Sequence, residues 1–463
     1  MDFLRKGRLM RNPLFLIPLL FCVPGYSQLT LERAVHQAMS QYPAVRASLQ
    51  QVSAAAAGIN LARTSYLPRA DFLGQVNRAT HNNIFGMLLS QSVISPISGP
   101  VLGTNSHESV WGSGVGVLVS WEPFDFGLRR ANVGIAESAR NIANAQVAVT
   151  QLQAGIAAAD AYLTIVAAQQ TVVAARAGVE RARVLNQSIE TLVKNELRPG
   201  AEASRSRAEL ALAETQLIQG EQAVDVGRAA LAQVLGVPPQ SITVESESLL
   251  KLPPEIPGEA AAISQHPLAM AQSAAIEEVK AREKALDRSY YPRFNLEGTT
   301  YARGTGIQAT GMTGGAASGL GPNIQNWGVG VCVTFAAFDI PSIRARKQIE
   351  HYRELAETAR YDQVLQDLNG QVEKAKATLA GTRRVAQNLP IQLEAARATE
   401  QQASARYKAG LTTIVEVAEA ERILTQTEID DALARLSVWR ALLAIAAAQG
   451  DLKPYVDQVS LAR

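Results

Sequence analysis

The stretch SYLPRADFLG at residues 65–74 occurs a second time as SYYPRFNLEG at residues 289–298, 224 positions further along the chain. A second motif, VGVLVSWEPFD at residues 115–125, occurs again as VGVCVTFAAFD at residues 329–339, 214 positions later. Self-similarity at a long and nearly constant spacing is typical of a structural unit that is built more than once. We therefore predict an internal two-fold structural repeat, in which the first copy has ten extra residues between the two motifs.

Both copies contain helix-breaking and helix-starting residues in the same order. Pro68 and Pro292 end Ala- and Gln-rich stretches that we predict to be helical, at about residues 30–65 and 259–289, because proline terminates a helix and moves the preceding residue towards extended geometry. Asp125 and Asp339 end the second motif and are natural N-cap residues for a following helix. We predict that these four residues mark the junctions between helices and strands.

Long helical patterns follow the second motif in both copies. They cover about residues 127–194 and 341–408, and after a break a return helix runs to Gly236 or Gly450. A helix of this length extends over roughly 100 Å. Such a helix is too long for an ordinary globular domain and indicates a coiled-coil-like assembly.

The strand-like segments alternate, with a period of two, between apolar residues and small or polar ones. In the second strand of each copy, one face is β-branched and ends in an aromatic residue. The residues of this face are Val115, Val117, Val119, Trp121, Val329, Val331, Val333 and Phe335. The pattern is typical of a transmembrane barrel, although a single such strand also fits a soluble sandwich. Because two hairpins (about 69–125 and 293–338) accompany very long helices, we predict that these eight residues face lipid.

Four strands are too few for one chain to close a barrel, since even small barrels have about eight. Open strand edges are not stable within a membrane. The pattern therefore predicts an α+β membrane protein in which several copies of the chain share one β-barrel, continuous with a long helical part.

Residues 1–27 have the features of a secretory signal peptide. Four basic residues among the first eleven precede an apolar run, and small residues precede the expected cleavage site before Gln28. The phenylalanine before Cys22 makes this a poor lipoprotein signal. No later segment has the length and hydrophobicity expected of a transmembrane helix. We expect an exported chain that enters a membrane only as strands.

Charge and residue types argue against several classes of function. With 44 basic and 42 acidic residues, the chain has no charge excess that would indicate a nucleic-acid partner. The five histidines show no metal-ligand spacing, and there is no phosphate-binding glycine loop. Cys332 remains alone once the signal peptide is removed. We therefore expect no catalytic site, no cofactor and no bound metal.

With these features the chain resembles the TolC-type outer-membrane efflux proteins over nearly all of its mature length. The matching features are the two-fold repeat, the paired Tyr-x-Pro breaks, the Phe-Asp junctions and the stretch KAGLTTIVEV at residues 408–417. The resemblance implies a homotrimer in which each chain contributes four strands to one twelve-stranded barrel in outer-membrane lipid, above a periplasmic α-helical tunnel. Such ducts act passively as exits for an inner-membrane pump, which they engage through a periplasmic adaptor protein.

The resemblance also places the turns between each long helix and its return helix at the inner end of the tunnel, where an adaptor docks. The residues concerned are Gly410, Leu411 and Thr412 in the second copy, and Leu197, Arg198 and Gly200 in the first. Glu196 occupies the position that corresponds to Gly410. The first turn therefore departs from the family pattern.

Two carboxylates three positions apart, Glu416 and Glu419, follow the second turn. Glu416 also fits a capping box with Thr413, which is the simpler interpretation, whereas Glu419 lies beyond such a box. The resemblance places both acids at the closed end of the tunnel, where family members carry acidic residues around the pore. Positions i and i+3 share a helix face, and acidic rings favour cations over anions. We predict a pore constriction at these two residues.

The predicted organisation is a signal peptide (1–27), a first repeat (28–236), a linker (237–258), a second repeat (259–450) and a C-terminal tail (451–463). The favoured function is the exit duct of a tripartite efflux system for small molecules such as drugs, toxic compounds or metal ions. One alternative is the exit duct of type I protein secretion. Another is an exported coiled-coil scaffold or adhesin that transports nothing and is water-soluble without detergent.

Overall fold

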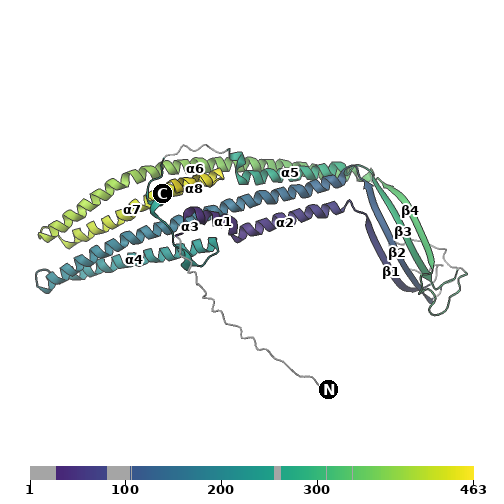
Figure 1. Cartoon of the computed structure of the whole chain (residues 1–463), viewed down its shortest axis with the longest axis horizontal. Coiled ribbons are helices and arrows are strands. Elements are labelled where there is room, and N and C mark those ends of the chain that lie inside the picture. The colour runs from purple at the N-terminus through teal and green to yellow at the C-terminus, as the bar shows by residue number, and fades with distance from the viewer. Residues whose placement is uncertain are drawn as a thin grey trace, which may run out of the picture.

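The computed structural model describes residues 28–80, 105, 107–254, 262–308, 310–335 and 337–462. The predicted signal peptide with Cys22, and most of the loop after the first strand, lie outside these described residues. The described chain forms a long rod of helices that meets a β-sheet at one end (Figure 1).

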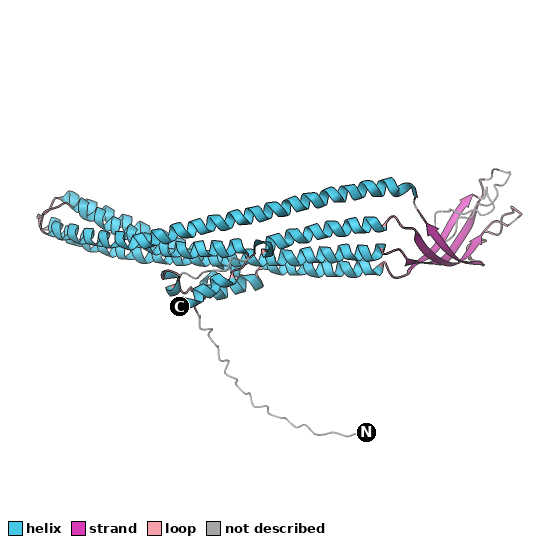
Figure 2. Cartoon of the chain, turned by 90° about the horizontal axis from the view of Figure 1, so that it is seen from above, coloured by secondary structure: helices cyan, strands magenta, loops and turns pink. Residues whose placement is uncertain are grey.

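The sheet is antiparallel and has four strands, shown in magenta in Figure 2. β1 (Arg69–Thr80) and β2 (Ser109–Phe124) form the first hairpin, and β3 (Arg293–Thr305) and β4 (Ile324–Thr334) form the second. The strand order is β1-β2-β3-β4, so the pairing of β2 with β3 joins the two hairpins. β1 and β4 are therefore the two edges of the sheet.

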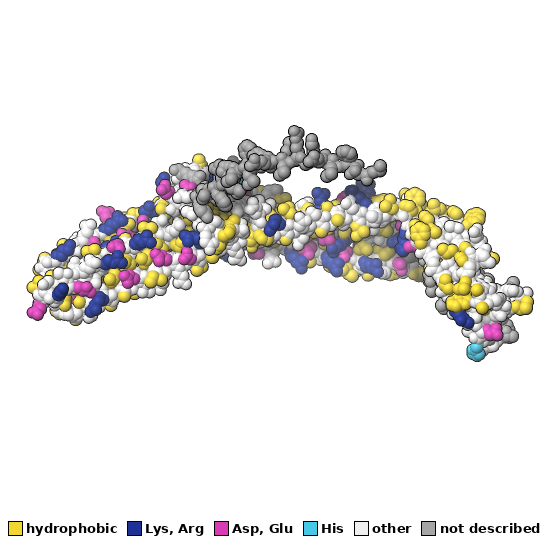
Figure 3. Space-filling view, turned by 60° about the horizontal axis from the view of Figure 1, so that its bottom comes forward, with side chains coloured by type: hydrophobic (Ala, Val, Ile, Leu, Met, Phe, Trp, Pro, Cys, Tyr) yellow, Lys and Arg dark blue, Asp and Glu magenta, His cyan; other side chains and the backbone are white. Residues whose placement is uncertain are grey.

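The strand register places the predicted lipid-facing residues on one side of the sheet. Val117 lies opposite Phe72 on β1 and Thr300 on β3, and Thr300 lies opposite Trp327 on β4. Cross-strand neighbours point to the same face, so this side is apolar across all four strands. Of the eight predicted residues, Val117 is half-buried and the others are exposed. The other face carries Asp71, Gln75, Ser120, Glu297, Thr299, Tyr301 and Arg303. Figure 3 shows hydrophobic side chains gathered at the sheet end of the molecule.

Two long helical hairpins form most of the rod. α3 (Leu128–Lys194, 67 residues) is followed by α4 (Gly200–Leu235), and α6 (Ile340–Lys408, 69 residues) is followed by α7 (Ile414–Gln449). At 1.5 Å per residue, α3 and α6 are each roughly 100 Å long. Both hairpin turns lie at the end of the rod farthest from the sheet (left in Figure 1).

The helical stretch predicted at about residues 30–65 is two helices instead of one. α1 (Leu31–Gln41) ends at Tyr42, and α2 (Pro43–Thr64) begins at Pro43, because a residue without an N–H is tolerated in a first helical turn but not inside a helix. In the second half, α5 (Pro267–Arg288) begins at a proline too, several residues after the predicted start. α2 packs along α3, and α5 packs along both α3 and α6.

The largest hydrophobic core lies midway along the rod, where α1, α3, α4 and α7 meet α8 (Lys453–Leu461). The segment after α4 closes over this core. The Trp439 indole donates to the Lys251 carbonyl at 3.0 Å, and the Tyr162 hydroxyl accepts from the Glu245 N–H at 3.0 Å. The segment between the two halves is therefore attached to both long hairpins.

Contrary to the sequence prediction, α3 has the length and composition of a helix that could cross a membrane, the one such helix among the described residues. It packs against α1, α2, α4, α5 and α7. Small residues allow this packing, since a Cβ at Gly178 would lie 2.8 Å from the Thr425 hydroxyl of α7. We interpret the apolar residues of α3 as interfaces with these five helices.

Candidate functional site

The two hairpin turns have the same backbone conformation. In each, a left-handed residue donates its N–H to the carbonyl three positions back, and the next residue donates to the carbonyl five positions back. The donor–acceptor distances are 3.0 and 2.9 Å in the first turn, and 3.0 and 2.8 Å in the second. The left-handed residue is Glu196 in the first turn (φ +53°) and Gly410 in the second (φ +74°). A left-handed residue other than glycine costs about 1–2 kcal/mol, so the departure at Glu196 affects the energy of the turn but not its shape.

The predicted docking residues differ in their exposure to solvent. Gly410, Leu411, Leu197 and Gly200 are exposed, whereas Thr412 and Arg198 are half-buried. The Arg198 guanidinium lies 4.9 Å from the centroid of the Tyr407 ring and 3.8 Å from the Glu202 carboxylate. Arg198 is thus bound within its own chain, which leaves Leu197 and Leu411 as the large exposed apolar side chains of the two turns.

Tyr407 connects the two hairpins near their turns. Its hydroxyl, on α6, donates to Glu202 Oε2, on α4, at 2.9 Å, and its ring is only 5% exposed. Burial and the adjacent Glu202 carboxylate raise the pKa of Tyr407 to about 12, so the hydroxyl keeps its proton near neutral pH. The bond joins residues 205 positions apart, and no sequence pattern indicates it.

Glu416 and Glu419 lie exposed at the start of α7, each beside an arginine. Arg422 donates two hydrogen bonds to Glu419, at 2.6 and 3.0 Å, and these lower the pKa of Glu419. Glu416 lies 3.9 Å from Arg406 at the end of α6. The Thr413 side chain makes no cap hydrogen bond, so the capping-box interpretation of Glu416 is wrong. The two acids are part of a mixed-charge cluster, which the sequence did not predict.

A third acid of α7, Glu421, is half-buried where α3, α4, α6 and α7 approach one another. Burial and the Glu400 and Glu209 carboxylates raise the pKa of Glu421 to about 7, against the opposing effect of Arg181. Arg181 itself donates to Glu428 at 2.9 Å, in an ion pair between α3 and α7. Sequence reasoning missed Glu421 because the charges that affect it come from three other helices.

We expect Glu421 to make the wild type lose thermal stability, relative to Glu421→Gln, as the pH rises from about 4.5 towards about 7. The folded-state pKa of Glu421 is raised above its ordinary value of 4.5 to about 7. Its contribution to stability is therefore complete below the unfolded-state pKa and is lost as the pH rises through the folded-state pKa. Melting temperatures followed by circular dichroism measure the effect. Glu373→Gln, which removes an exposed carboxylate of α6, is the control and should retain the wild-type slope. An equal slope in Glu421→Gln and wild type would contradict this assignment.

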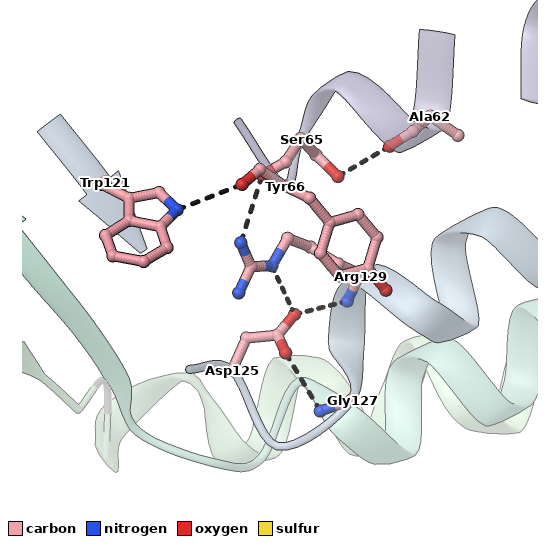
Figure 4. A network of polar contacts seen from close by, with 7 residues as sticks. All are labelled: Ala62, Ser65, Tyr66, Trp121, Asp125, Gly127 and Arg129. Carbon is pink, nitrogen blue, oxygen red and sulfur yellow. Dashed lines mark hydrogen bonds and ion pairs between the residues drawn. The ribbon is translucent and has the colours of Figure 1, made fainter. Parts of the chain in front are cut away.

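A buried ion pair closes the junction between β2 and α3 (Figure 4). Asp125 accepts hydrogen bonds from the N–H of Gly127 at 3.1 Å, from the N–H of Arg129 at 2.5 Å and from Arg129 Nε at 3.1 Å. Arg129 also donates to the Ser65 carbonyl at 3.2 Å and lies over the Tyr66 ring. Burial raises the pKa of Asp125, but the hydrogen bonds from Arg129 and Gly127 outweigh it and lower the pKa. The pair thereby connects the chain before β1 with the chain after β2.

Asp339 stands at the N-cap position of α6, as predicted, but its side chain makes no cap hydrogen bond, and it lies exposed in a short 3₁₀ turn. Ile343 stands 214 positions after Arg129, so the second half has no arginine at the corresponding position. The proline junctions are alike in the two halves, since Pro68 directly precedes β1 and Pro292 directly precedes β3.

His266, the histidine buried at the start of α5, has a structural role. Its Nδ1 accepts from the Leu268 N–H at 3.1 Å, and its Nε2 lies 3.2 Å from the Ala447 carbonyl. Burial lowers the pKa of His266, which favours the neutral ring that this cap requires. Within the described ranges, no group of three or more His, Cys, Asp or Glu side chains is placed to hold a metal ion.

The model of a protein family described as outer membrane efflux protein matches residues 34–237 and 260–451 of the chain. Among solved structures, the chain is similar to the outer-membrane channel OprN, with 22% identity, 91% of this chain and 89% of that chain covered, and a TM-score of 0.69. It is also similar to the CmeC outer membrane channel of Campylobacter jejuni (15% identity, 93% and 89% covered, TM-score 0.69). The open state of the MtrE outer membrane channel of Neisseria gonorrhoeae matches as well (17% identity, 91% and 89% covered, TM-score 0.68). No curated protein matches the sequence. At these identities the solved structures establish a common fold.

Proposed function

Because this chain belongs to the outer membrane efflux protein family, we propose that it is the outer-membrane exit duct of a tripartite efflux system. In this role it passively exports small molecules that an inner-membrane pump delivers through a periplasmic adaptor protein. The sheet lies in the Gram-negative outer membrane, and the helical rod extends into the periplasm.

The observation that carries this proposal is a four-stranded sheet with an apolar face and two open edges, continuous with helices roughly 100 Å long. Open edges are unstable in lipid. Three copies supply twelve strands, above the number of about eight that small barrels need. This supports a homotrimer with one shared barrel. The exposed valines and aromatic residues of this face argue against a water-soluble scaffold, because large apolar patches on soluble proteins promote association.

The order of elements supports the proposed two-fold repeat. Each half contains a helix ending before a proline, a β-hairpin, a helix of 67 or 69 residues and a return helix of 36 residues. The halves correspond to the proposed repeats at 28–236 and 259–450, with residues 237–258 as the linker.

We place the pore constriction at Glu416 and Glu419, and the adaptor-docking surface at the exposed parts of the two turns. The exposed side chains of Leu197 and Leu411 support the docking surface, since they present apolar groups at equivalent positions of two similar turns. In a trimer these turns form six docking positions around the tunnel end.

The constriction is tested by ion selectivity in planar bilayers. The wild-type duct should prefer cations, because in a trimer the two acids give six carboxylates near the axis. In a Glu416→Gln, Glu419→Gln double variant, Arg406 and Arg422 remain without their acidic partners. We therefore expect the reversal potential in a KCl gradient to move past neutrality towards anion preference.

Arg422→Gln is the matched variant, in which we expect ion selectivity to change in the opposite direction. It removes the partner of Glu419 and should increase the preference for cations. An unchanged reversal potential in both variants would show that these residues lie away from the constriction. The exit-duct proposal as a whole requires a heat-modifiable trimer in the outer-membrane fraction that conducts ions. A soluble monomer, or a trimer without conductance, would overturn it.

A further inference from the structure

A cavity of about 290 Å³ lies beside the central hydrophobic core, where α7 packs against both α3 and α6. Short side chains leave this space open, since Ala174 and Ala177 of α3 and Ala432 of α7 line it. Leu250, from the segment between the two halves, also lines the cavity and packs against the core. Small-molecule sites in proteins begin at about 300 Å³, so the cavity has room for one compact ligand.

Asp431, on α7, lines this cavity with a carboxylate that the chain satisfies only in part. The residue is 7% exposed, and its Oδ2 accepts a hydrogen bond from Arg435 Nη2 at 2.6 Å. Its Oδ1 is buried and accepts no hydrogen bond from any part of the chain that the structure describes. Buried carboxylate oxygens are nearly always hydrogen-bonded, because a buried charged acceptor without a donor is unfavourable. Oδ1 of Asp431 therefore requires a donor from outside these parts of the chain.

The other charged residues of the cavity differ in whether the chain binds them. Arg435 also donates through Nη1 to the Leu250 carbonyl at 3.3 Å, which holds its guanidinium in place. Glu428, the second acid of the lining, accepts from Arg181 at 2.9 Å. Arg397 of α6 is exposed, lines the cavity and makes no hydrogen bond or ion pair with the described residues. The cavity thus offers a ligand one free acceptor and one free guanidinium.

We propose that the cavity binds a small zwitterion, an α-amino acid with an aliphatic side chain. The ammonium group of this ligand donates to Asp431 Oδ1, and its carboxylate accepts hydrogen bonds from the Arg397 guanidinium. Its aliphatic side chain packs against Val173, Leu250 and Leu393, the larger apolar residues of the lining. The ligand then contacts α3, α6 and α7 together.

The charges of the lining favour a zwitterion over a simple ion. Two acids, Glu428 and Asp431, and two arginines, Arg397 and Arg435, line the cavity, so their charges balance. A simple cation would be repelled by both arginines. A simple anion would be repelled by both acids and would leave Asp431 Oδ1 without a donor. A ligand that carries both charges avoids each of these costs.

The test is isothermal titration calorimetry of the purified full chain in detergent, with L-leucine and L-alanine as probes. We expect both amino acids to bind the wild type. Arg397→Gln should weaken L-leucine binding at least about tenfold, because a hydrogen bond between two charged groups is lost. Arg384→Gln removes another exposed arginine of α6, outside the lining, and should bind L-leucine as the wild type does.

Two analogues of L-leucine separate the two contacts. Leucinamide lacks the carboxylate, so Arg397→Gln should bind it as tightly as the wild type does. 4-Methylpentanoate lacks the ammonium group, so Asp431→Asn should not weaken its binding, although the same variant should bind L-leucine at least about tenfold more weakly. Asp431→Asn also changes the ion pair with Arg435. Ala177→Leu, which fills the cavity from an exposed position of α3, therefore gives an independent variant that should lose L-leucine binding.

A folded wild type that binds neither amino acid would show that solvent alone satisfies Asp431 Oδ1, and it would overturn the proposal. So would equal L-leucine affinities in the wild type, Arg397→Gln and Ala177→Leu. An equal loss of affinity for L-leucine and for leucinamide in Arg397→Gln would also overturn it, because the loss would not depend on the ligand's carboxylate. The cavity lies within one chain, so these results do not depend on the exit duct. Binding by a protein that conducts no ions would support the site and contradict only the duct.

Discussion

Arg129→Met is expected to destabilise the protein by about 3–5 kcal/mol, because the change leaves a buried carboxylate without its charge partner. Arg129 and Asp125 have side chains only 8% and 10% exposed. Two backbone N–H groups still bind Asp125 in the variant, so we expect the lower end of this range. The variant also loses the bond to the Ser65 carbonyl that attaches the start of β1. Chemical unfolding in detergent measures the loss, and less of the variant should be recovered in the outer membrane.

Two controls separate the ion pair from a general effect of changing the junction. In an Asp125→Asn, Arg129→Met double variant no charge is left unpaired, so stability should return part of the way to wild type. Asp339→Asn changes the corresponding residue of the second half, which makes no cap bond, and should alter stability by less than about 0.5 kcal/mol. An Arg129→Met protein as stable as the wild type would show that the pair contributes nothing.

Tyr407→Phe is expected to open the tunnel end and raise the resting conductance of the reconstituted duct severalfold. The variant keeps the buried ring but loses the hydrogen bond to Glu202, the kind of bond that contributes about 1.5–3 kcal/mol when one partner is charged. A trimer contains three such bonds between the α3–α4 and α6–α7 hairpins. Their loss shifts the equilibrium towards states in which the hairpins separate. Single-channel recording in planar bilayers measures the change.

Glu202→Gln is the complementary variant, because it keeps an acceptor for the hydroxyl but removes the charge. We expect its conductance to lie between those of the wild type and Tyr407→Phe. Tyr352→Phe removes an exposed hydroxyl from the same helix, α6, and should leave the conductance unchanged. If Tyr407→Phe conducts like the wild type, the bond to Glu202 does not hold the tunnel end closed.

The elements of the fold follow from local features of the chain. Pro68 and Pro292 precede β1 and β3, and the period-2 alternation from Val115 to Trp121 gives β2 an apolar and a polar side. These features depend on residues within a few positions of one another, and the duplicated motifs present them twice. The errors were local too, since Pro43 divides one predicted helix into two and the Asp339 side chain makes no cap hydrogen bond at the start of α6.

The sequence alone determined which segments are strands, which are long helices and which face of each strand is apolar, because backbone dihedral preferences and alternation act over short distances. Only the tertiary structure decided which polar and charged side chains form contacts over long distances in the sequence. The Tyr407 hydroxyl bonds to Glu202, 205 positions away, and Arg129 bonds to the Ser65 carbonyl, 64 positions away. The pKa of Glu421 is raised by burial and by carboxylates of two other helices. Such contacts depend on how helices roughly 100 Å long pack side by side, and small residues such as Gly178 set how closely they approach. The sequence therefore located the two hairpin turns, and the packing of the helices determined the bonds that join the hairpins next to these turns.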